Sequence, residues 1–408
     1  MKFAYYALVS ILLILFGSGC KIRSKKHFSN NGNKNYIVLV SLDGCRWDYP
    51  SIHGMKNINS IGKEGVHGIM KPSYPSSTFP NHYTIATGLV PDHHGIINNK
   101  FWDQTHNATY AISDSATRNN PLYYGGEPIW ITAQKQHIKT ASIYWIGSDI
   151  AIQATLPTYY KVWADEPRLS FNERVDEVIR LLEKEDKDRP QLIMVYFEEP
   201  DGTGHHHGPE SVETKRMAQQ VDQLMGELWQ RIKKLQIGDK VNLIILSDHG
   251  MTDISDKRFY NVDKYIKPEW VYNISGATPT NIYTRPGCRD SVVNALSNLE
   301  NITVWKREDV PARFQYGENK NCGDVIVAPT LGWQFSDRPR HLKGAHGYDP
   351  EEKDMQVLFR AIGPNFKKSY KMKNPFPNVD IYPLLCYLLQ ISPAKNDGNI
   401  KDILPMLK

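Results

Sequence analysis

The sequence predicts an α/β fold with a central, mostly parallel sheet and helices on both faces. Three apolar runs of strand length support this prediction: YIVLVSL at 36–42, LIMVYF at 192–197 and VNLIIL at 241–246. Nearly continuous apolar runs are typical of strands that are buried on both faces. A helical pattern separates the second run from the third, and strand–helix–strand order with buried strands indicates a parallel sheet.

The chain begins with a segment that resembles a secretory signal. MKFAYYALVSILLILFGSGC combines one lysine, an apolar run at 3–16 and small residues, and this run is short for a membrane span of ~20 residues. Cys20 is placed as a bacterial lipoprotein cysteine would be. We expect a signal peptide at 1–19, a lipid anchor at Cys20 on a polar tether at 20–35, and a periplasmic or cell-surface location. The alternatives are an ordinary signal cleaved nearby and an uncleaved anchor.

Composition allows a large core and gives little indication of a polymeric partner. Of the 408 residues 40% are hydrophobic, and the net charge is +5. This excess is mild for such a length, and no basic block with interleaved aromatics indicates a stable nucleic-acid complex. We expect one domain at 36–408 with a small α+β insertion at about 281–333. No pattern indicates an oligomeric state.

Amphipathic patterns predict the helices that cover the sheet. Hydrophobic residues recur at spacings of three and four over 171–182 and 211–235. A fourth core-like strand is expected at 355–361, and 378–390 is expected to form a closing helix. Within the insertion, short alternating runs indicate strands, and 289–299 is a candidate helix.

The four cysteines after Cys20 have different surroundings in the sequence. Export makes a disulfide possible. Cys288 and Cys322 both lie in polar, glycine-containing loop sequence and are the expected pair. Cys386 lies in an apolar helical run, which indicates a buried thiol. No CxxC or Cys/His zinc-finger spacing is present.

The stretch at 71–103, KPSYPSSTFPNHYTIATGLVPDHHGIINNKFWD, brings a hydroxyl to the start of a predicted helix. Thr78 is expected at the N-cap, and Pro80 fits the first helical turn. A hydroxyl there lies beside unpaired N–H groups and the positive end of the helix dipole, which favours a bound anion such as phosphate. Taken alone, this pattern indicates a plain cap rather than a nucleophile.

Acidic and imidazole side chains follow each of the three predicted strands. In an open α/β sheet the ligand crevice lies outside the carboxyl ends of the strands. The residues expected along this rim are Asp43, Asp201, His205, Asp248 and His249. Each of them singly is explained as a turn residue, a solvated loop residue or a satisfied core histidine. All of them together at strand ends are poorly explained as separate accidents.

These residues form two ligand sets for zinc-like divalent ions. The sets are Asp201, His205 and His346, the last in a glycine-rich loop, and Asp43, Asp248 and His249. Imidazole nitrogen and carboxylate oxygen are suitable ligands for zinc. Two ions ~3.5–4 Å apart would clamp a phosphoryl group. Thr78, activated by coordination to one ion, would attack in line to form a phospho-threonine that a metal-activated water hydrolyses.

Five sequence blocks resemble the nucleotide pyrophosphatase/phosphodiesterase family, which belongs to the alkaline phosphatase superfamily. They are SLDG at 41–44, TFPNHYTIATGLVPDHHGIINN at 78–99, YFEEPDGTGHHHGP at 196–209, SDHGM at 247–251 and GAHGYD at 344–349. The blocks occur in order over 36–390, nearly the whole mature chain. The resemblance implies an alkaline phosphatase-like fold, two zinc ions per chain and the compact bacterial lipoprotein form.

The resemblance also implies roles for single residues. The two ligand sets match the two metal sites of the family, and Thr78 matches the nucleophile, which is also a ligand in the Asp43 set. Asn99 matches a residue that donates to a phosphoryl oxygen beside the Thr78 backbone N–H. Phe79 matches an aromatic that stacks under a nucleobase. Tyr160 fits the position of the opposing ring, and Tyr159 is an equal candidate if the register slips by one.

Three functions are consistent with these expectations. The leading one is a metal-dependent phosphodiesterase that cleaves nucleotide phosphodiesters or pyrophosphates and releases a nucleoside monophosphate. The first alternative is a phospholipid or choline-phosphodiester hydrolase of the same family, which an aromatic cage for a quaternary ammonium would support. The second is a surface binding protein on an inactive scaffold. That alternative predicts the loss of a ligand or of the nucleophile, yet all seven positions hold competent residues.

Overall fold

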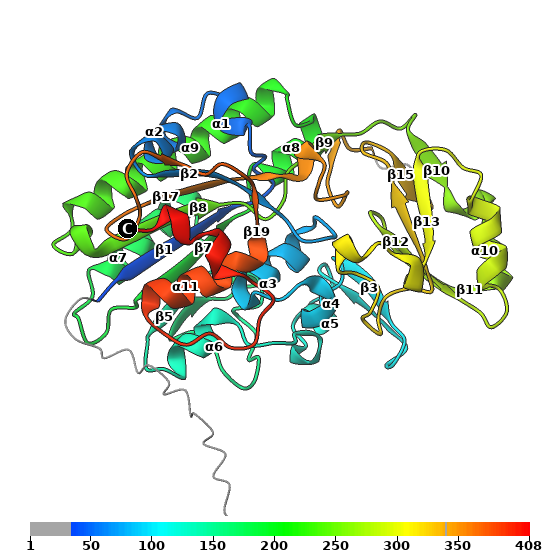
Figure 1. Cartoon of the computed structure of the whole chain (residues 1–408), viewed down its shortest axis with the longest axis horizontal. Coiled ribbons are helices and arrows are strands. Elements are labelled where there is room, and N and C mark those ends of the chain that lie inside the picture. Colours follow the sequence, from blue (N-terminus) through cyan, green and yellow to red (C-terminus); the bar gives the residue numbers. More distant parts are fainter. Residues whose placement is uncertain (1–33, 339–340) are drawn as a thin grey trace, which may run out of the picture. The chain divides into compact units, whose positions relative to one another are not determined.

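The computed structural model describes residues 34–338 and 341–408 (Figure 1). The expected signal peptide, Cys20 and the tether up to Asn33 lie outside the described residues. Residues 34–408 form a compact unit by themselves. No helix within the described ranges combines the length and apolarity that crossing a membrane requires.

A large sheet forms the centre of this unit. Among the described residues its strand order is β18-β2-β17-β8-β1-β7-β5-β6, and β19 also pairs with β2. The bounds are β1 (Tyr36–Leu42), β2 (Val66–Lys71), β5 (Thr140–Ile143), β6 (Tyr159–Lys161), β7 (Leu192–Phe197), β8 (Val241–Leu246), β17 (Val357–Ile362), β18 (Tyr370–Lys371) and β19 (Phe376–Pro377). The five strands from β8 to β6 run parallel, whereas β17 is antiparallel to both of its neighbours. The prediction of a mostly parallel α/β sheet is confirmed.

Helices cover both faces of the sheet, and alternate residues of β1 contact the two layers. Ile37 and Leu39 belong to a core that includes residues of α3 (Thr78–Thr87), α6 (Ile129–Gln134) and α11 (Ile381–Leu389). Val38 and Val40 belong to a second core with residues of three other helices. These are α2 (Lys56–Glu64), α7 (Phe171–Leu182) and α9 (Val212–Lys234).

The two predicted amphipathic helices form close to their expected bounds because each has a side-chain cap. Ser170 accepts a hydrogen bond from the backbone of Glu173 at the start of α7, and Glu173 completes the capping box. Ser211 accepts from the backbone of Thr214 at the start of α9. Both helices bury the apolar face that their periodicity predicted.

The insertion contains an antiparallel four-stranded sheet in the order β11-β12-β14-β13. Its elements are β11 (Val271–Gly276), β12 (Thr280–Thr284), α10 (Arg289–Leu296), β13 (Ile302–Lys306) and β14 (Val325–Pro329). The sheet therefore begins at Val271 rather than near residue 281. The reason is that most residues of β11 are only partly buried, so its sequence lacks the apolar run of a core strand.

Shorter elements connect these layers. They are α1 (Tyr49–Ile52), β3 (Lys100–Asp103), β4 (Ala108–Ala111), α4 (Pro91–His94), α5 (Ser115–Arg118), α8 (Asp201–His207), β9 (Thr252–Asp253), β10 (Phe259–Asn261), β15 (Gln334–Ser336) and β16 (Gly344–Ala345).

The expected disulfide between Cys288 and Cys322 is wrong, since every cysteine of the described residues is free. Cys322 is buried, and its Sγ lies 3.4 Å from Oδ1 of Asp92, which that thiol contacts in place of a second sulfur. Cys288 lies just before α10 and is half-buried. Loop composition indicates that two cysteines can be near the surface, but it does not encode the distance between them. Cys386 is buried in α11, as expected.

Candidate functional site

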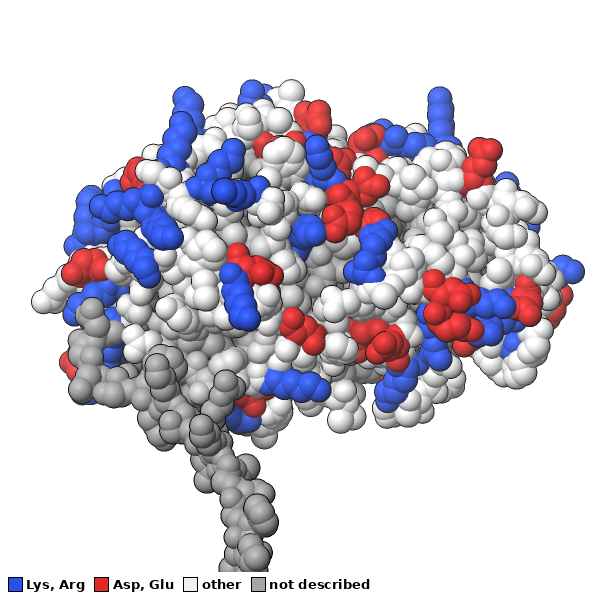
Figure 2. All heavy atoms as spheres, viewed as in Figure 1, with Lys and Arg blue, Asp and Glu red and all other residues white. Residues whose placement is uncertain are grey.

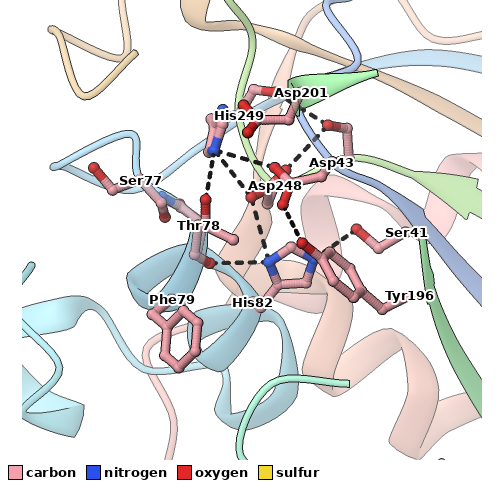
Figure 3. A network of polar contacts seen from close by, with 12 residues as sticks. Ser41, Asp43, Ser77, Thr78, Phe79, His82, Tyr196, Asp201, Asp248 and His249 are labelled. Atoms are coloured by element: carbon pink, nitrogen blue, oxygen red, sulfur yellow. Dashed lines mark hydrogen bonds and ion pairs between the residues drawn. The ribbon is translucent and has the colours of Figure 1, made fainter. Parts of the chain in front are cut away.

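Five of the six predicted ligands follow three adjacent parallel strands at their carboxyl ends. Figure 3 shows Asp43, Asp201, Asp248 and His249 close together there. Asp43 follows β1, and Asp248 and His249 follow β8. Asp201 begins α8, the helix that follows β7, and His205 lies one turn later. Because β7, β1 and β8 are neighbours with the same direction, their carboxyl ends lie side by side.

The structure assembles the two predicted ligand sets. We call them the Asp201 group, which is Asp201, His205 and His346, and the Asp43 group, which is Asp43, Asp248 and His249. Within each group one ligand atom from every residue lies within 4.8 Å of the others. The two groups adjoin, because the rings of His249 and His346 stack with 3.6 Å between their centroids.

The three histidines share one orientation. In each, Nδ1 lies within hydrogen-bond distance of a backbone carbonyl: Gly344 O for His205 (2.7 Å), Gly250 O for His249 (2.9 Å) and Ser76 O for His346 (2.9 Å). A carbonyl can only accept, so Nδ1 carries the proton and the lone pair is on Nε2. Such second-shell contacts typically orient metal-ligating histidines.

Each of the three aspartates has one buried oxygen without a hydrogen-bond donor among the described residues. These atoms are Asp43 Oδ1, Asp201 Oδ1 and Asp248 Oδ2. Burying an acceptor without a partner is costly, and a buried carboxylate is normally paired or coordinates a metal. Together with the three Nε2 atoms, the donor set therefore fits divalent cations in both groups.

Electrostatics in the Asp43 group also favours a cation. Burial, with Asp248 and Asp201 nearby, raises the pKa of Asp43 well above its usual range. Burial opposes ionisation of Asp248 as well, but His249 and His82 beside it lower the pKa of this carboxyl overall. Positive charge in the group would relieve the repulsion between these carboxylates.

Close approach of the two groups depends on Gly44. Its φ of +65° is in the left-handed region, which favours glycine, and a Cβ at this position would lie 2.9 Å from Oδ1 of Asp201. The backbone N–H of Gly44 donates to Oδ1 of Asp248. The Asp-Gly pair after β1 is therefore a tight turn that also holds ligands from two neighbouring strands.

Thr78 points into the Asp43 group. Its Oγ1 lies 3.0 Å from Nε2 of His249. The prediction of Thr78 as the N-cap was wrong by one residue: Ser77 is the N-cap, and Thr78 is the first residue of α3. The reason is that Ser77 keeps an extended backbone, with φ of −130° and ψ of 154°, while its carbonyl already accepts a hydrogen bond from the N–H of Asn81. Thr78 still lies in the first turn, where N–H groups have no intrahelical partner.

Asn99 lies beside the first turn of α3, next to Thr78. Its Oδ1 accepts a hydrogen bond from the backbone N–H of Phe79 at 3.0 Å. This contact orients the side-chain amide of Asn99 and leaves its NH₂ group available to donate to another acceptor. Phe79 itself is partly buried at the edge of both cores.

Sequence reasoning missed two residues that hold the ligands. The Tyr196 hydroxyl donates to Oδ2 of Asp43 at 2.5 Å. The His82 ring lies between Ser41 Oγ (2.8 Å), the Thr78 carbonyl (2.9 Å) and Oδ2 of Asp248 (3.3 Å). A signal existed for His82, which lies four residues after Thr78 on the same helix. Tyr196 gave no such signal, because its hydroxyl is a single polar group in an otherwise apolar strand.

Replacing Tyr196 with phenylalanine tests its role. We expect the apparent metal affinity to fall roughly 10–100-fold, as for other second-shell partners, because Asp43 loses its donor. Metal titration of the apo protein measures this change. Tyr83→Phe is the matched control, since that hydroxyl donates to the Gly125 carbonyl. Equal affinities for Tyr196→Phe and wild type would contradict the role.

The structure does not bring the two predicted base-stacking tyrosines to the groups. Tyr159 pairs with Ala141 of β5, and Ala141 pairs with Ile193 in the amino-terminal half of β7. The Tyr159 hydroxyl donates to the carbonyl of Asp188, which precedes β7. Tyr159 therefore lies towards the amino end of the sheet, whereas the ligands lie at the carboxyl end. Tyr160 is 41% exposed on the same short edge strand. The prediction placed these tyrosines at the site, but both lie within β6, and the sequence spacing did not show where this strand ends.

Trp163, beyond the carboxyl end of β6, lies closer to the site. Its ring centroid is 5.8 Å from that of Tyr196, whose hydroxyl contacts Asp43. The Trp163 backbone N–H donates to Asp149, and the guanidinium of Arg168 lies 4.5 Å from its ring centroid. Trp163 is therefore the aromatic residue of this segment that the fold places beside the ligands.

A cavity of about 950 Å³ opens beside the Asp201 group. His205, His346 and Asn99 line its inner end. Its other walls include polar and charged side chains from β3 and the insertion side: Lys100, Asp263, Ser275, Thr278, Arg338 and His341. The site therefore has room for a bulky polar group next to the ligands.

Comparisons with known proteins agree with this geometry. Residues 37–349 match the family model described as type I phosphodiesterase/nucleotide pyrophosphatase. Bovine ectonucleotide pyrophosphatase/phosphodiesterase family member 3 is 36% identical over 91% of this chain, which spans 44% of the bovine protein. Human family member 5 is 34% identical over 92% of this chain and 80% of the human protein.

Solved structures show the same similarity. Murine ectonucleotide pyrophosphatase/phosphodiesterase 5, as an inactive variant in complex with AMP, superposes with a TM-score of 0.86 at 32% identity. The match covers 92% of this chain and 100% of the murine chain. The fold is therefore alkaline phosphatase-like, and the chain belongs to the type I phosphodiesterase/nucleotide pyrophosphatase family.

Proposed function

We propose that this protein is a two-zinc phosphodiesterase that hydrolyses nucleotide phosphodiesters or pyrophosphates to nucleoside monophosphates. One observation carries the proposal: two adjoining groups of three candidate ligands lie beside the hydroxyl of Thr78, which contacts His249 at the start of a helix. An inactive binding scaffold would not need all seven of these residues. Their convergence therefore favours an enzyme over a binding protein.

The Asp201 group and the Asp43 group would each hold one zinc ion, since both combine imidazole nitrogen with carboxylate oxygen. When bound, the ions would polarise the phosphoryl group and stabilise the charge that develops on its oxygens. His82 and Tyr196 orient the protein ligands around them.

Thr78 is the nucleophile of the proposed reaction. His249 lies at hydrogen-bond distance from its hydroxyl, and the helix N-terminus favours the negative charge of a phosphoryl group. Oγ1 gives up its proton to solvent and attacks phosphorus while the bond between phosphorus and the leaving oxygen breaks. The leaving oxygen takes up a proton, and water then hydrolyses the phospho-threonine. The NH₂ of Asn99 donates to a phosphoryl oxygen in this arrangement.

The two sides of the site would receive different parts of the substrate. Thr78 lies with the Asp43 group, so an in-line displacement sends the leaving group towards the Asp201 group and the cavity beside it. Phe79 and Trp163 are not part of the lining of that cavity. We assign these two rings to the retained nucleoside, with Trp163 in the role first given to Tyr159 or Tyr160.

Trp163→Ala tests the assignment of the base-binding ring. We expect KM for a nucleotide substrate to rise about tenfold, because stacking on a base is worth ~1–3 kcal/mol, while KM for a small aromatic phosphodiester changes much less. Steady-state kinetics on both substrates measures the difference, and Tyr159→Phe is the control. If Trp163→Ala affected both substrates equally, base stacking would be the wrong role.

A phosphocholine ester is the competing substrate. The faces of Phe79 and Trp163 can contact a quaternary ammonium as well as a base. The AMP complex of the murine relative favours the nucleotide. Comparing turnover of a nucleoside monophosphate ester with that of a phosphocholine ester tests the choice, since a preference for the latter would assign the site to lipid head groups. We also propose export and attachment through Cys20.

A further inference from the structure

A second cavity, of about 760 Å³, lies at the opposite end of the central sheet from the metal-ligand groups. It is lined by Gly238 and Asp239, just before β8, and by Ile362 and Gly363 at the end of β17. Because β17 is antiparallel to β8, both segments lie at the amino end of β8. The ligand groups lie at the carboxyl ends of the same strands, so the two surfaces point in opposite directions.

Lysines dominate the rim of this cavity. We call eight exposed lysines the lysine face: Lys233, Lys367, Lys368 and Lys408, which line the cavity, and Lys63, Lys234, Lys240 and Lys371, which lie within two residues of a lining residue in the sequence. Glu64 and Asp239 are the acidic residues of the lining. Figure 2 shows the corresponding cluster of basic side chains around the last residue of the chain.

The lysine face is not neutralised by the protein. Within residues 34–338 and 341–408, no carboxylate lies at ion-pair distance from any of its eight ammonium groups, whereas Lys34, Lys135 and Lys139 are each paired. Two of the eight contact aromatic rings instead: Lys233 lies 5.8 Å from the Trp229 ring centroid, and Lys367 lies 5.2 Å from that of Tyr370. Unpaired like charges on one face repel, so an external anion would stabilise them.

The floor of the cavity is apolar. Trp229, Phe366, Ile362 and Pro364 line it beneath the lysines. Exposed lysines around a cavity match the anionic phosphates at the surface of a membrane. A single-stranded nucleic acid would instead require exposed rings that stack with bases, and the rings of Trp229 and Phe366 are buried.

The chain enters the fold at this same end. Tyr36 begins β1 and pairs with Val241, and Gly363 packs against Val241 and Asn242. The proposed anchor, Cys20, precedes the described residues by residues 21–33. A segment of that length spans roughly 43–47 Å when fully extended, which is ample for this end to reach a membrane that holds a lipid on Cys20.

We propose that the lysine face docks on a membrane surface that contains anionic phospholipid head groups. Docking there turns the ligand groups and the cavity beside them away from the bilayer, towards soluble substrates. This inference is independent of the proposed catalytic function, because it concerns a different surface and a different ligand.

Vesicle binding by the compact unit 34–408 tests the proposal without any contribution from the N-terminal segment. We expect it to sediment with vesicles of phosphatidylcholine containing phosphatidylglycerol, but not with pure phosphatidylcholine, and to be released by high salt. Lys233→Glu, Lys368→Glu and Lys408→Glu together should weaken this binding at least roughly 100-fold, since each lysine near such a surface contributes about fivefold.

A matched control separates location from net charge. Lys257→Glu, Lys264→Glu and Lys320→Glu together change the net charge equally but lie outside the lysine face and are also exposed. They should weaken binding far less, and both triple variants should keep wild-type turnover of a soluble substrate. Equal loss in the two triple variants, no preference for anionic vesicles, or tighter binding to duplex DNA than to vesicles would each overturn the proposal.

Discussion

Replacing Thr78 with alanine is expected to lower kcat by at least about 10⁴-fold while the protein keeps its metal ions and its fold. The reason is that the hydroxyl, 3.0 Å from His249 Nε2, is the atom that attacks phosphorus in the proposed reaction, and alanine offers no substitute. Steady-state kinetics, metal analysis and circular dichroism on the same preparation measure the three quantities.

Thr78→Ser is the matched control, because it retains the attacking oxygen and the helix start. We expect it to keep measurable turnover and to form a phosphorylated residue at position 78 that acid quenching traps. A Thr78→Ala variant with more than a tenth of wild-type kcat would remove this residue as the nucleophile.

Replacing Asp248 with alanine should remove the metal ion of the Asp43 group and lower kcat at least roughly 10³-fold. Oδ2 of Asp248 is buried without a hydrogen-bond donor and lies 3.2 Å from His249 Nε2, so this oxygen is positioned to bind a cation. Metal analysis should give about one ion per chain in place of two.

Asp222 provides a control of the same residue type and similar burial. Its carboxylate accepts hydrogen bonds from the backbone N–H groups of Asn57 and Ile58 at the start of α2, remote from the ligands. Asp222→Ala should lower the free energy of unfolding by about 1–2 kcal/mol and leave the metal content unchanged. Two ions in Asp248→Ala would show that this residue is not a ligand.

The parts of the fold that the sequence predicted well are those whose burial is complete. β1, β7 and β8 are buried at every position, so each is a nearly continuous apolar run with clear ends. β2 alternates buried and partly buried residues around a glycine, and β6 is a short edge strand, so neither was recognised. β11 was missed for the same reason, which displaced the boundary of the insertion.

The convergence of the candidate ligands was predictable because their positions follow from strand ends. Asp43 and Asp248 come directly after buried strands, and parallel neighbours bring such residues together. Roles that depend on side-chain direction were not predictable. The Tyr196 hydroxyl reaches Asp43 because of the register between β7 and β1, and the Trp163 ring reaches the site because of the path of the loop after β6. The predicted pairing of Cys288 with Cys322 was wrong because the sequence does not give the distance between them.

The central claim is that two metal ions and Thr78 cleave nucleotide esters. The most direct test is hydrolysis by residues 34–408 with zinc, using a nucleoside monophosphate ester, ATP, a phosphocholine ester and a simple phosphate monoester, each with and without chelator. We predict release of nucleoside monophosphate from the first two substrates, abolished by chelator and restored by zinc. Turnover that persists after the metal has been removed, or no turnover of either nucleotide, would contradict the claim.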